Sequence, residues 1–530
     1  MKKWILGHTT LLAVLALIII GFSIYANSFG NQMFWDDFDG IVNNAYVHNF
    51  SIGDFFTKNL IAGSGLESNY WRPVLLITYS IEWHLWGNWV GGYHLTNTLL
   101  HIGNAILVFF VLFALFKKKL VSFAVALFFL VSPLQTEAIT YVSGRGDPLS
   151  FFFTLLAMLF YIRIHQKKSD SGAASYWYLA AFFMYPLALM TKERSIILPG
   201  FLLLVDIWYA LELKEKWKKS VREIVMRLLP FAILGIGFLI LRGTLLDFQN
   251  TFNIYNTHTY YTDHITARFF TFLSTLPVYA GLMLFPVGLH MERSLSFPVA
   301  TAFFNPQVIL GFVIAALLIA VSALFWKRDK RIAFGAAWFF VAIFPASGIA
   351  VPVAGLIYEH YMYAPIVGFF LFLAALVSLI PRNLRTLQYA LISVGGAGII
   401  FFGIQTIKRN TDWRDPITFY TQTLRYAPQS VRIWNNLGIA YADAGNLAYA
   451  KNAYERTITL DPANAVPHYD LGNVYETEGK MKDAIAEWQR SIALDPTFIF
   501  PYQKLYNYYV SIRDPASAQK ILDALPKNKN

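Results

Sequence analysis

The sequence predicts an all-α protein in which a polytopic bundle of transmembrane helices is followed by a C-terminal α-solenoid. Of its 530 residues, 56% are hydrophobic and only 14% are charged, whereas soluble globular chains carry about 25% charged residues. The mean hydropathy is +0.45, and long apolar runs alternate with short polar loops. The last part of the chain is polar and repeats itself. A single soluble domain, a disordered chain and a fibrous chain are therefore excluded.

Two further features of the composition narrow the function. The chain has no cysteine, which excludes disulfides, thiolate nucleophiles and cysteine-ligated metals. Its net charge of +11 is in the range of nucleic-acid-binding proteins. However, the basic excess lies in short loops between apolar runs, which is the pattern that sets membrane topology. We therefore predict no nucleic-acid partner.

The apolar runs predict about 11 transmembrane spans, each near the ~20 residues that a bilayer requires. The first run, 4–25, is too long for a signal peptide and lacks a clear cleavage site, so we expect a retained helix. The other predicted spans are 93–116, 120–141, 149–165, 176–191, 195–211, 225–242, 305–326, 332–347, 363–380 and 387–406.

The charges of the loops predict the orientation. One alternating set is rich in lysine and arginine, including 117–119, 167–168 and 327–331, and the positive-inside rule assigns this set to the cytoplasm. The more acidic set then faces outward, as does the chain after Ile407. We accordingly divide the chain into a membrane region, 1–407, and an outward tail, 408–530.

The segment 265–290 does not fit this alternation, because Pro277 and Pro286 interrupt its apolar run. Broken backbone at membrane depth must be buried in protein or line a cavity. We therefore predict a re-entrant or interfacial hairpin on the outward side. A simple crossing here would reverse the orientation of everything after it.

The tail contains an internal repeat of about 34 residues, the period of tetratricopeptide repeats. Gly438 recurs as Gly472, and Gly445 recurs as Gly479. A half repeat ends at Pro428, and a degenerate one covers 502–518. Each helix pair in such an array buries its apolar face only against its neighbours. The tail is therefore predicted to be a curved solenoid with a concave binding surface.

The first outward loop contains two adjacent carboxylates, Asp36 and Asp37, among aromatic residues. Mutual repulsion and desolvation by the aromatic rings both raise the pKa of at least one of them, which suits a general base. The alternative interpretation is a solvated loop with a helix cap.

A polar stripe follows on a predicted helix, where His94, Asn97 and His101 share one face. Polar side chains at membrane depth are costly and point to function. The alternative is a ladder of hydrogen bonds between helices. No carboxylate completes a ligand set at helical spacing, so a metal site is not predicted.

The second and third outward loops carry isolated cations, notably Arg145, Lys192 and Arg194. Cations at the outer edge of an apolar bundle are placed to bind a lipid phosphate. The alternative, snorkelling to ordinary headgroups, fits Lys192 and Arg194 better than Arg145. Gly144 and Gly146 flank Arg145 and let the backbone approach a ligand closely.

A later outward turn places Glu359 and His360 among tyrosines, where the pair is suited to contact an acceptor or a sugar. The alternative is an aromatic belt with a carboxylate at a helix start.

Taken in order, these segments resemble the transmembrane and tetratricopeptide-repeat-containing O-mannosyltransferases, within the GT-C superfamily of polyprenyl-phosphate-sugar glycosyltransferases. The resemblance covers nearly the whole chain and is weakest over 243–304. Its segments are Trp35-Asp36-Asp37, Tyr70-Trp71-Arg72-Pro73, Gly92-Tyr93-His94-Leu95-Thr96-Asn97-Thr98-Leu99-Leu100-His101, Ser132-Pro133-Leu134-Gln135-Thr136-Glu137-Ala138, Ser143-Gly144-Arg145-Gly146-Asp147, Thr191-Lys192-Glu193 and Glu359-His360-Tyr361-Met362-Tyr363.

The resemblance implies an inverting transfer of a monosaccharide from a polyprenyl-phosphate donor to a hydroxyl of an extracytoplasmic acceptor, in the first place a protein. It implies that 1–407 is a glycosyltransferase-like domain and that the tail binds a protein or peptide acceptor. Asp36 or Asp37 would be the general base. The donor phosphate would be bound by Arg72, Arg145 and Lys192. Further substrate-binding residues would be His94, Asn97, Glu137, Asp147, Glu193, Glu359 and His360.

Two other functions share parts of this pattern. One is a non-catalytic membrane scaffold whose repeats recruit envelope proteins, and the other is a flippase or polymer ligase for lipid-linked sugars. The scaffold does not explain why Asp36, Asp37, Arg145 and Lys192 share one side. The absence of a targeting motif beyond the first helix favours a bacterial inner membrane. The residues identify neither the sugar nor the polyprenol, and they do not decide whether a divalent metal takes part.

Overall fold

The computed structural model describes residues 2–166, 172–212, 217–248, 259–295, 297–353 and 355–526. In these ranges every regular element is helical. The chain forms two compact units, Met1–Arg414 and Asp415–Asn530. The boundary between the units lies a few residues after the one predicted at 407, because helix α17 (Arg385–Asp412) continues past that position. Lys167 and Lys168, assigned above to a cytoplasmic loop, lie outside the described residues.

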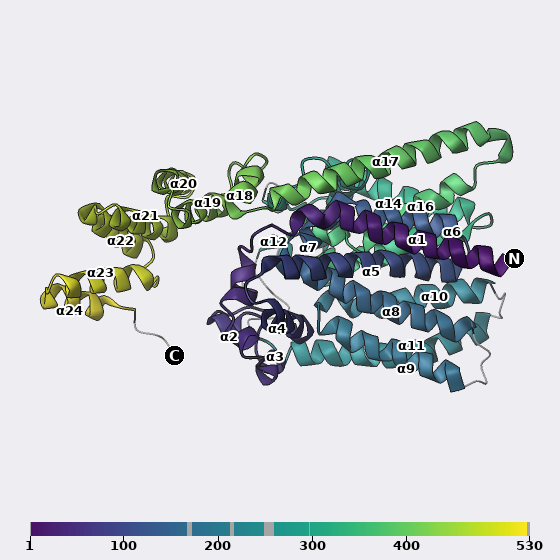
Figure 1. Ribbon diagram of the computed structural model, residues 1–530, viewed down its shortest axis with the longest axis horizontal. Helices are drawn as coiled ribbons and strands as arrows, with labels where there is room; N and C mark the ends of the chain where they lie inside the picture. The colour runs from purple at the N-terminus through teal and green to yellow at the C-terminus, as the bar shows by residue number, and fades with distance from the viewer. Residues whose placement is uncertain are drawn as a thin grey trace. The chain divides into compact units, whose positions relative to one another are not determined.

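The first unit is a bundle of long helices that run side by side (Figure 1). Other helices lie in the loops at one end of the bundle, namely α2 (Ala45–His48), α3 (Ile52–Thr57), α4 (Pro73–Trp86), α7 (Thr136–Ile139) and α12 (Tyr260–Asp263). The long helices are α1 (Lys2–Tyr25), α5 (Val90–Phe116), α6 (Lys119–Val131), α8 (Gly146–Gln166), α9 (Gly172–Leu189), α10 (Leu198–Glu212), α11 (Trp217–Arg242), α13 (Ile265–Leu284), α14 (Pro306–Phe325), α15 (Lys330–Ile343), α16 (Pro365–Ser378) and α17.

The number of spans is lower than the sequence predicts. Among the described residues, eight helices are long and apolar enough to cross a membrane, or nine if the bent pair α6–α7 counts as one span. The prediction of about 11 was too high, because several apolar runs are interrupted. The predicted spans 332–347 and 363–380 form α15 and α16, which have 14 residues each. The predicted span 120–141 bends by 55° at its break.

The segment expected to form a proline-broken hairpin is instead one continuous helix, α13, so that prediction was wrong. Pro277 lies inside the helix and cannot bond to the Leu273 carbonyl one turn earlier. Gly311 of α14 packs directly against this carbonyl, since a Cβ added there would lie 1.8 Å from the oxygen. Close packing of a neighbouring helix thus covers the gap that the proline leaves. α13 has the length and composition of a membrane span, but both of its halves contact the loop 349–358, with Arg268 donating to the Ile349 carbonyl at 3.2 Å and Tyr279 to the Tyr358 carbonyl at 3.4 Å.

Contacts between segments that are distant in sequence define the two ends of the bundle, which we call the first rim and the second rim. At the first rim, Asn410 donates to the Ile24 carbonyl at 3.0 Å and accepts from Thr140 at 2.7 Å. At the second rim, the Lys330 ammonium donates to the Leu211 carbonyl at 3.1 Å. The first rim gathers the loops predicted to face outward, and the second rim gathers the described parts of the basic loops predicted to be cytoplasmic, including 117–119 and 327–331.

The second unit consists of the predicted repeats. Gly438 on one helix packs against Tyr454 on the next, and Gly472 packs in the same way against Trp488, leaving room for no side chain at either glycine. Gly445 and Gly479 adopt positive φ at the turns within the pairs. The helices are α18 (Pro416–Leu424), α19 (Val431–Asp443), α20 (Leu447–Leu460), α21 (Ala465–Thr477), α22 (Met481–Leu494), α23 (Phe500–Ser511) and α24 (Pro515–Ala524).

Candidate active site

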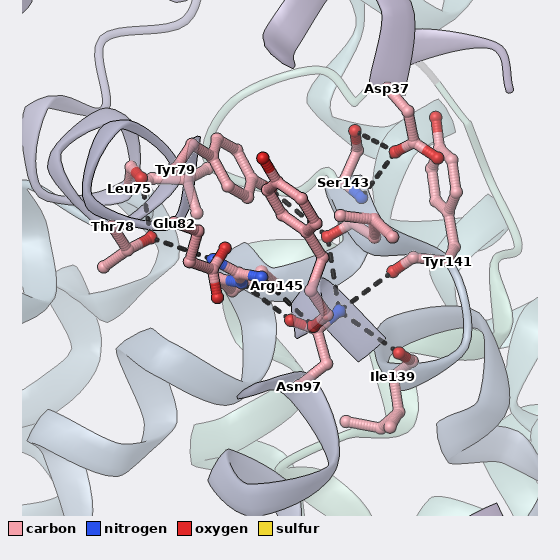
Figure 2. A network of polar contacts seen from close by, with 12 residues as sticks. Asp37, Leu75, Thr78, Tyr79, Glu82, Asn97, Ile139, Tyr141, Ser143 and Arg145 are labelled. Atoms are coloured by element: carbon pink, nitrogen blue, oxygen red, sulfur yellow. Dashed lines mark hydrogen bonds and ion pairs between the residues drawn. The ribbon is translucent and has the colours of Figure 1, made fainter. Parts of the chain in front are cut away.

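The two adjacent aspartates of the first loop have opposite environments. Asp37 is 1% exposed, and its Oδ1 accepts hydrogen bonds from the Ser143 amide at 2.8 Å and the Ser143 hydroxyl at 2.5 Å (Figure 2). Its Oδ2 accepts from the Phe34 amide at 3.2 Å. Burial raises the pKa of Asp37 to about 7, although these hydrogen bonds lower it. The side chain of Asp37 is therefore poised to exchange a proton near neutral pH.

Asp36 is exposed, and its amide donates to the Tyr141 hydroxyl at 3.0 Å. Its negative charge adds to the upward shift in the pKa of Asp37. Neither Ser143 nor Tyr141 was among the residues predicted for the site. Ser143 lies in the glycine-containing loop that drew attention to Arg145, so proximity to that motif was the available signal.

Arg145 is fully buried and is neutralised within the protein. Its guanidinium forms an ion pair with Glu82 and donates from Nε to Asn97 Oδ1 at 2.7 Å (Figure 2). It also lies 4.7 Å from the Tyr79 ring centroid. Gly144, expected to let the backbone approach a ligand, instead packs against the Glu137 carbonyl. The contacts of Arg145 are thus those of a residue that fixes the loop 143–146.

The polar residues of α5, His94, Asn97 and His101, make polar contacts with other segments of the bundle, as the alternative interpretation of the stripe requires. Asn97 donates to the Ile139 carbonyl at 3.1 Å, and His94 Nε2 lies 3.1 Å from the Asn31 carbonyl oxygen. His101 Nδ1 lies 2.9 Å from the Tyr363 hydroxyl. Both His94 and Asn97 are at most 1% exposed. These contacts tie α5 to the loops of the first rim.

Two predicted phosphate-binding cations meet over Gly146. A Cβ at Gly146 would lie 3.4 Å from Lys192 Cδ and 3.9 Å from Arg72 Nη1. Lys192 donates to Asp147 Oδ2 at 2.7 Å, and Arg72 contacts Glu193 at 3.3 Å. Burial lowers the pKa of Lys192 to about 8, although the Asp147 charge raises it. The side chains of Lys192 and Arg72 thus lie side by side next to Gly146.

A small open pocket lies beside this cluster. Its lining is mixed, and the polar part includes Arg194, whose guanidinium lies 3.9 Å from the Tyr361 ring centroid. Arg194 was named above among the outward cations but not among the residues that the resemblance assigns to the donor phosphate, and Tyr361 was not predicted as a binding residue. The lining residues are Asp147, Ser150, Phe151, Thr154, Arg194, Ser195, Ile197, Leu198, Phe201, Ala342, Ala346, His360, Tyr361, Tyr363, Ala364 and Pro365.

The remaining predicted residues form buried acid–base pairs behind the pocket. Glu137 accepts from the His360 amide at 3.0 Å and lies 2.8 Å from His360 Nδ1. Glu359 contacts Arg409 of α17 at 3.4 Å, and burial raises the pKa of Glu359. His360 therefore faces the pocket, whereas Glu137 and Glu359 support it from within the protein.

One short loop joins the carboxylate to the cations. Ser143 binds Asp37, and Asp147 binds Lys192. Four residues span at most about 14 Å even when fully extended. The residues predicted from distant parts of the sequence thus converge at one rim. Among the described residues, no group of three His, Asp or Glu side chains has the geometry to hold a metal ion.

Comparisons with known proteins agree with this architecture. Residues 431–464 match the family model described as tetratricopeptide repeat. Protein O-mannosyl-transferase TMTC4 of Homo sapiens is 26% identical over 481 residues, covering 81% of this chain and 64% of the relative. Protein O-mannosyl-transferase TMTC3 of Mus musculus is 23% identical over 476 residues, covering 84% of this chain and 51% of the relative.

The crystal structure of ArnT from Cupriavidus metallidurans bound to undecaprenyl phosphate has a TM-score of 0.43 and 14% identity, with 90% of this chain and 79% of that chain covered. The chain spans less than two thirds of the length of the first curated relatives. The match extends over most of the chain, and the family model matches one of its repeats. This confirms that the chain resembles the transmembrane and tetratricopeptide-repeat-containing O-mannosyltransferases.

Proposed function

We propose that this protein is a membrane glycosyltransferase that moves a mannose-type sugar from a polyprenyl-phosphate donor to a hydroxyl of a protein outside the cytoplasm, with inversion at the anomeric carbon. The names of its relatives support the enzyme class, the sugar and the protein acceptor. One observation carries the proposal. A buried carboxylate with a pKa of about 7, Asp37, and two cations, Arg72 and Lys192, all lie beside the same short loop, 143–147.

Asp37 is the general base in this mechanism. It takes the proton of the acceptor hydroxyl as the hydroxyl oxygen attacks the anomeric carbon, and the bond from that carbon to the phosphate oxygen breaks on the opposite face. A base with a pKa near the working pH is best suited to this step. Ser143 orients the Asp37 carboxylate through two hydrogen bonds.

The departing lipid phosphate gains charge as the bond breaks, so fixed cations stabilise the transition state. Arg72 and Lys192 lie beside the loop, and Arg194 lines the pocket. Arg145 has a different role from the one implied by the family resemblance, because its side chain is fully buried against Glu82 and Asn97, whereas the side chains of the ion-paired Arg72 and Lys192 stay partly exposed. It fixes the loop that carries Ser143 and Asp147.

The pocket is suited to a lipid phosphate because both polar and apolar residues line it. Arg194 and His360 would face the phosphate, while Leu198 and Phe201 would contact the prenyl chain. The first rim faces away from the cytoplasm in this proposal, since the basic loops lie at the second rim. The repeat tail, 408–530, would bind the protein acceptor.

The test is transfer of labelled mannose from polyprenyl-phosphate mannose to a serine- or threonine-containing acceptor peptide by the purified full chain in lipid nanodiscs. The expected product is a mannosyl peptide whose anomeric configuration, read by NMR, is opposite to that of the donor. Retention of configuration would exclude the proposed single displacement. Binding of the peptide with no transfer from any polyprenyl-phosphate sugar would instead favour the membrane scaffold.

A further inference from the structure

Three aromatic residues, Phe34, Tyr141 and Trp413, pack together beside the loop that contains Asp36 and Asp37, which we call the aspartate loop. The ring centroids of Tyr141 and Trp413 are 5.3 Å apart with an interplanar angle of 26°. The Phe34 ring lies 6.1 Å from Trp413 and 6.2 Å from Tyr141. Trp413 is 1% exposed. These distances are those of mutually packed aromatic rings.

Two members of this aromatic cluster hold the aspartates directly. The Phe34 amide donates to Asp37 Oδ2 at 3.2 Å, and the Tyr141 hydroxyl accepts from the Asp36 amide at 3.0 Å. The third ring, Trp413, packs against both of these residues. Its position therefore controls the two residues that fix the loop.

Trp413 is held firmly in turn by the end of α17. Asn31 donates to the Asn410 carbonyl at 2.9 Å, and the Gln32 amide donates to the Arg414 carbonyl at 2.8 Å. The Arg409 guanidinium lies 5.7 Å from the Trp413 ring centroid. The chain just before the aspartates is thus bonded to the chain just before the repeat unit.

We propose that Trp413 is a positioning residue for the general base: it holds Phe34 and Tyr141 so that the aspartate loop keeps its reactive geometry. This inference rests on the proposed function for its catalytic part. A displacement of about 1 Å at a reacting group costs up to about 100-fold in rate. Loss of the indole would therefore reduce turnover more than it reduces donor binding.

The kinetic test compares Trp413→Ala and Trp413→Phe in the full chain. We expect Trp413→Ala to lower kcat by about 10- to 100-fold while the KM for the lipid donor changes by less than about twofold. Trp413→Phe keeps a ring in the cluster and should restore kcat to within about threefold. The matched control is Trp208→Ala, since Trp208 is a buried tryptophan, 8% exposed, near the second rim.

A spectroscopic test does not depend on turnover. The chain has no cysteine, so Phe38→Cys, at a position 44% exposed directly after Asp37, accepts a single nitroxide label. The label should become more mobile with Trp413→Ala but not with Trp413→Phe or Trp208→Ala. An unchanged spectrum with Trp413→Ala, or an equal loss of kcat with Trp208→Ala, would overturn the positioning role. If the parent transfers no sugar, the proposed function fails, and the spectrum alone still decides whether Trp413 fixes the loop.

Discussion

Two carboxylates lie buried toward opposite rims of the bundle, and they differ in the partners that surround them. At the first rim, Asp37 accepts hydrogen bonds from the neutral Ser143 and from a backbone amide. Toward the second rim, Asp206 forms an ion pair with Arg227 at 3.2 Å. Asp206 also lies 2.9 Å from His165 Nε2 and accepts from the Tyr161 hydroxyl at 2.7 Å.

The difference separates a reactive group from a structural one. A buried carboxylate that meets only neutral donors is costly to ionise, so it keeps a strong affinity for protons. A carboxylate beside a cation forms half of an ion pair, and removal of either partner leaves the other charge without its counterion. Asp37 thus has the properties of a base, whereas Asp206 ties α8, α10 and α11 together.

The largest expected effect is that of Asp37→Asn, which should lower kcat by about 1,000-fold because an amide cannot accept the proton. The measurement is sugar transfer by purified variants of equal folded content. Asp39→Asn is the matched control, since Asp39 is a third acid in the same loop. Full activity in both Asp37→Asn and Asp36→Asn would remove the base from this loop.

Asp37→Asn should not lower the stability of the folded protein, in contrast to a substitution of Asp206. Burial raises the pKa of Asp37 to about 7, whereas an unfolded aspartate has a pKa of about 3.9. The folded state therefore binds more protons between these values, and the charge of Asp37 is destabilising above pH 7 but absent below about pH 4. Asp37→Asn should be the more heat-resistant protein at pH 8, with no difference at the acid end.

Asp206→Asn should have the opposite profile, with lower stability and normal chemistry. Breaking a buried ion pair from one side costs about 3–5 kcal/mol. Chemical unfolding in detergent measures this loss, and turnover per folded molecule should stay within about twofold of the parent. A variant that folds normally but has lost turnover would mean that Asp206 belongs to the chemistry.

A smaller effect is expected at the cations that we propose bind the donor phosphate. Lys192→Met should raise the KM for the lipid donor by about 10- to 100-fold, the equivalent of one charge-assisted hydrogen bond. Arg328→Ala, a change near the second rim, is the control for general loss of charge. If the Lys192 variant and the parent have the same KM for the lipid donor, Lys192 does not bind the donor phosphate.

The smallest effect is a shift in pH dependence. Because Asp37 must be deprotonated to act, kcat/KM should rise with pH through about 7 and then level off. Burial is the main cause of the high pKa, and the Asp36 charge adds to it. Asp36→Asn should therefore move the midpoint to lower pH by less than about one unit. A shift to higher pH would contradict the assignment.

Local patterns explain why much of the fold was predictable. The repeats are encoded by glycines and prolines at a fixed spacing, and each pair folds against its neighbour. The span count was less accurate, because α15 and α16 end earlier than their apolar runs. Pro277 misled the prediction for α13, since Gly311 of another helix compensates for it.

The sequence by itself determined that this chain is a membrane bundle with a repeat tail, and that its unusual polar residues share one side. Hydropathy, loop charge and repeat spacing are properties of neighbouring residues, so they can be read along the chain. Only the tertiary structure decided which aspartate is buried, that Glu82 pairs with Arg145, and that Trp413 packs against Tyr141. Asp37 and Ser143 are 106 positions apart, and only helix packing brings such pairs into contact.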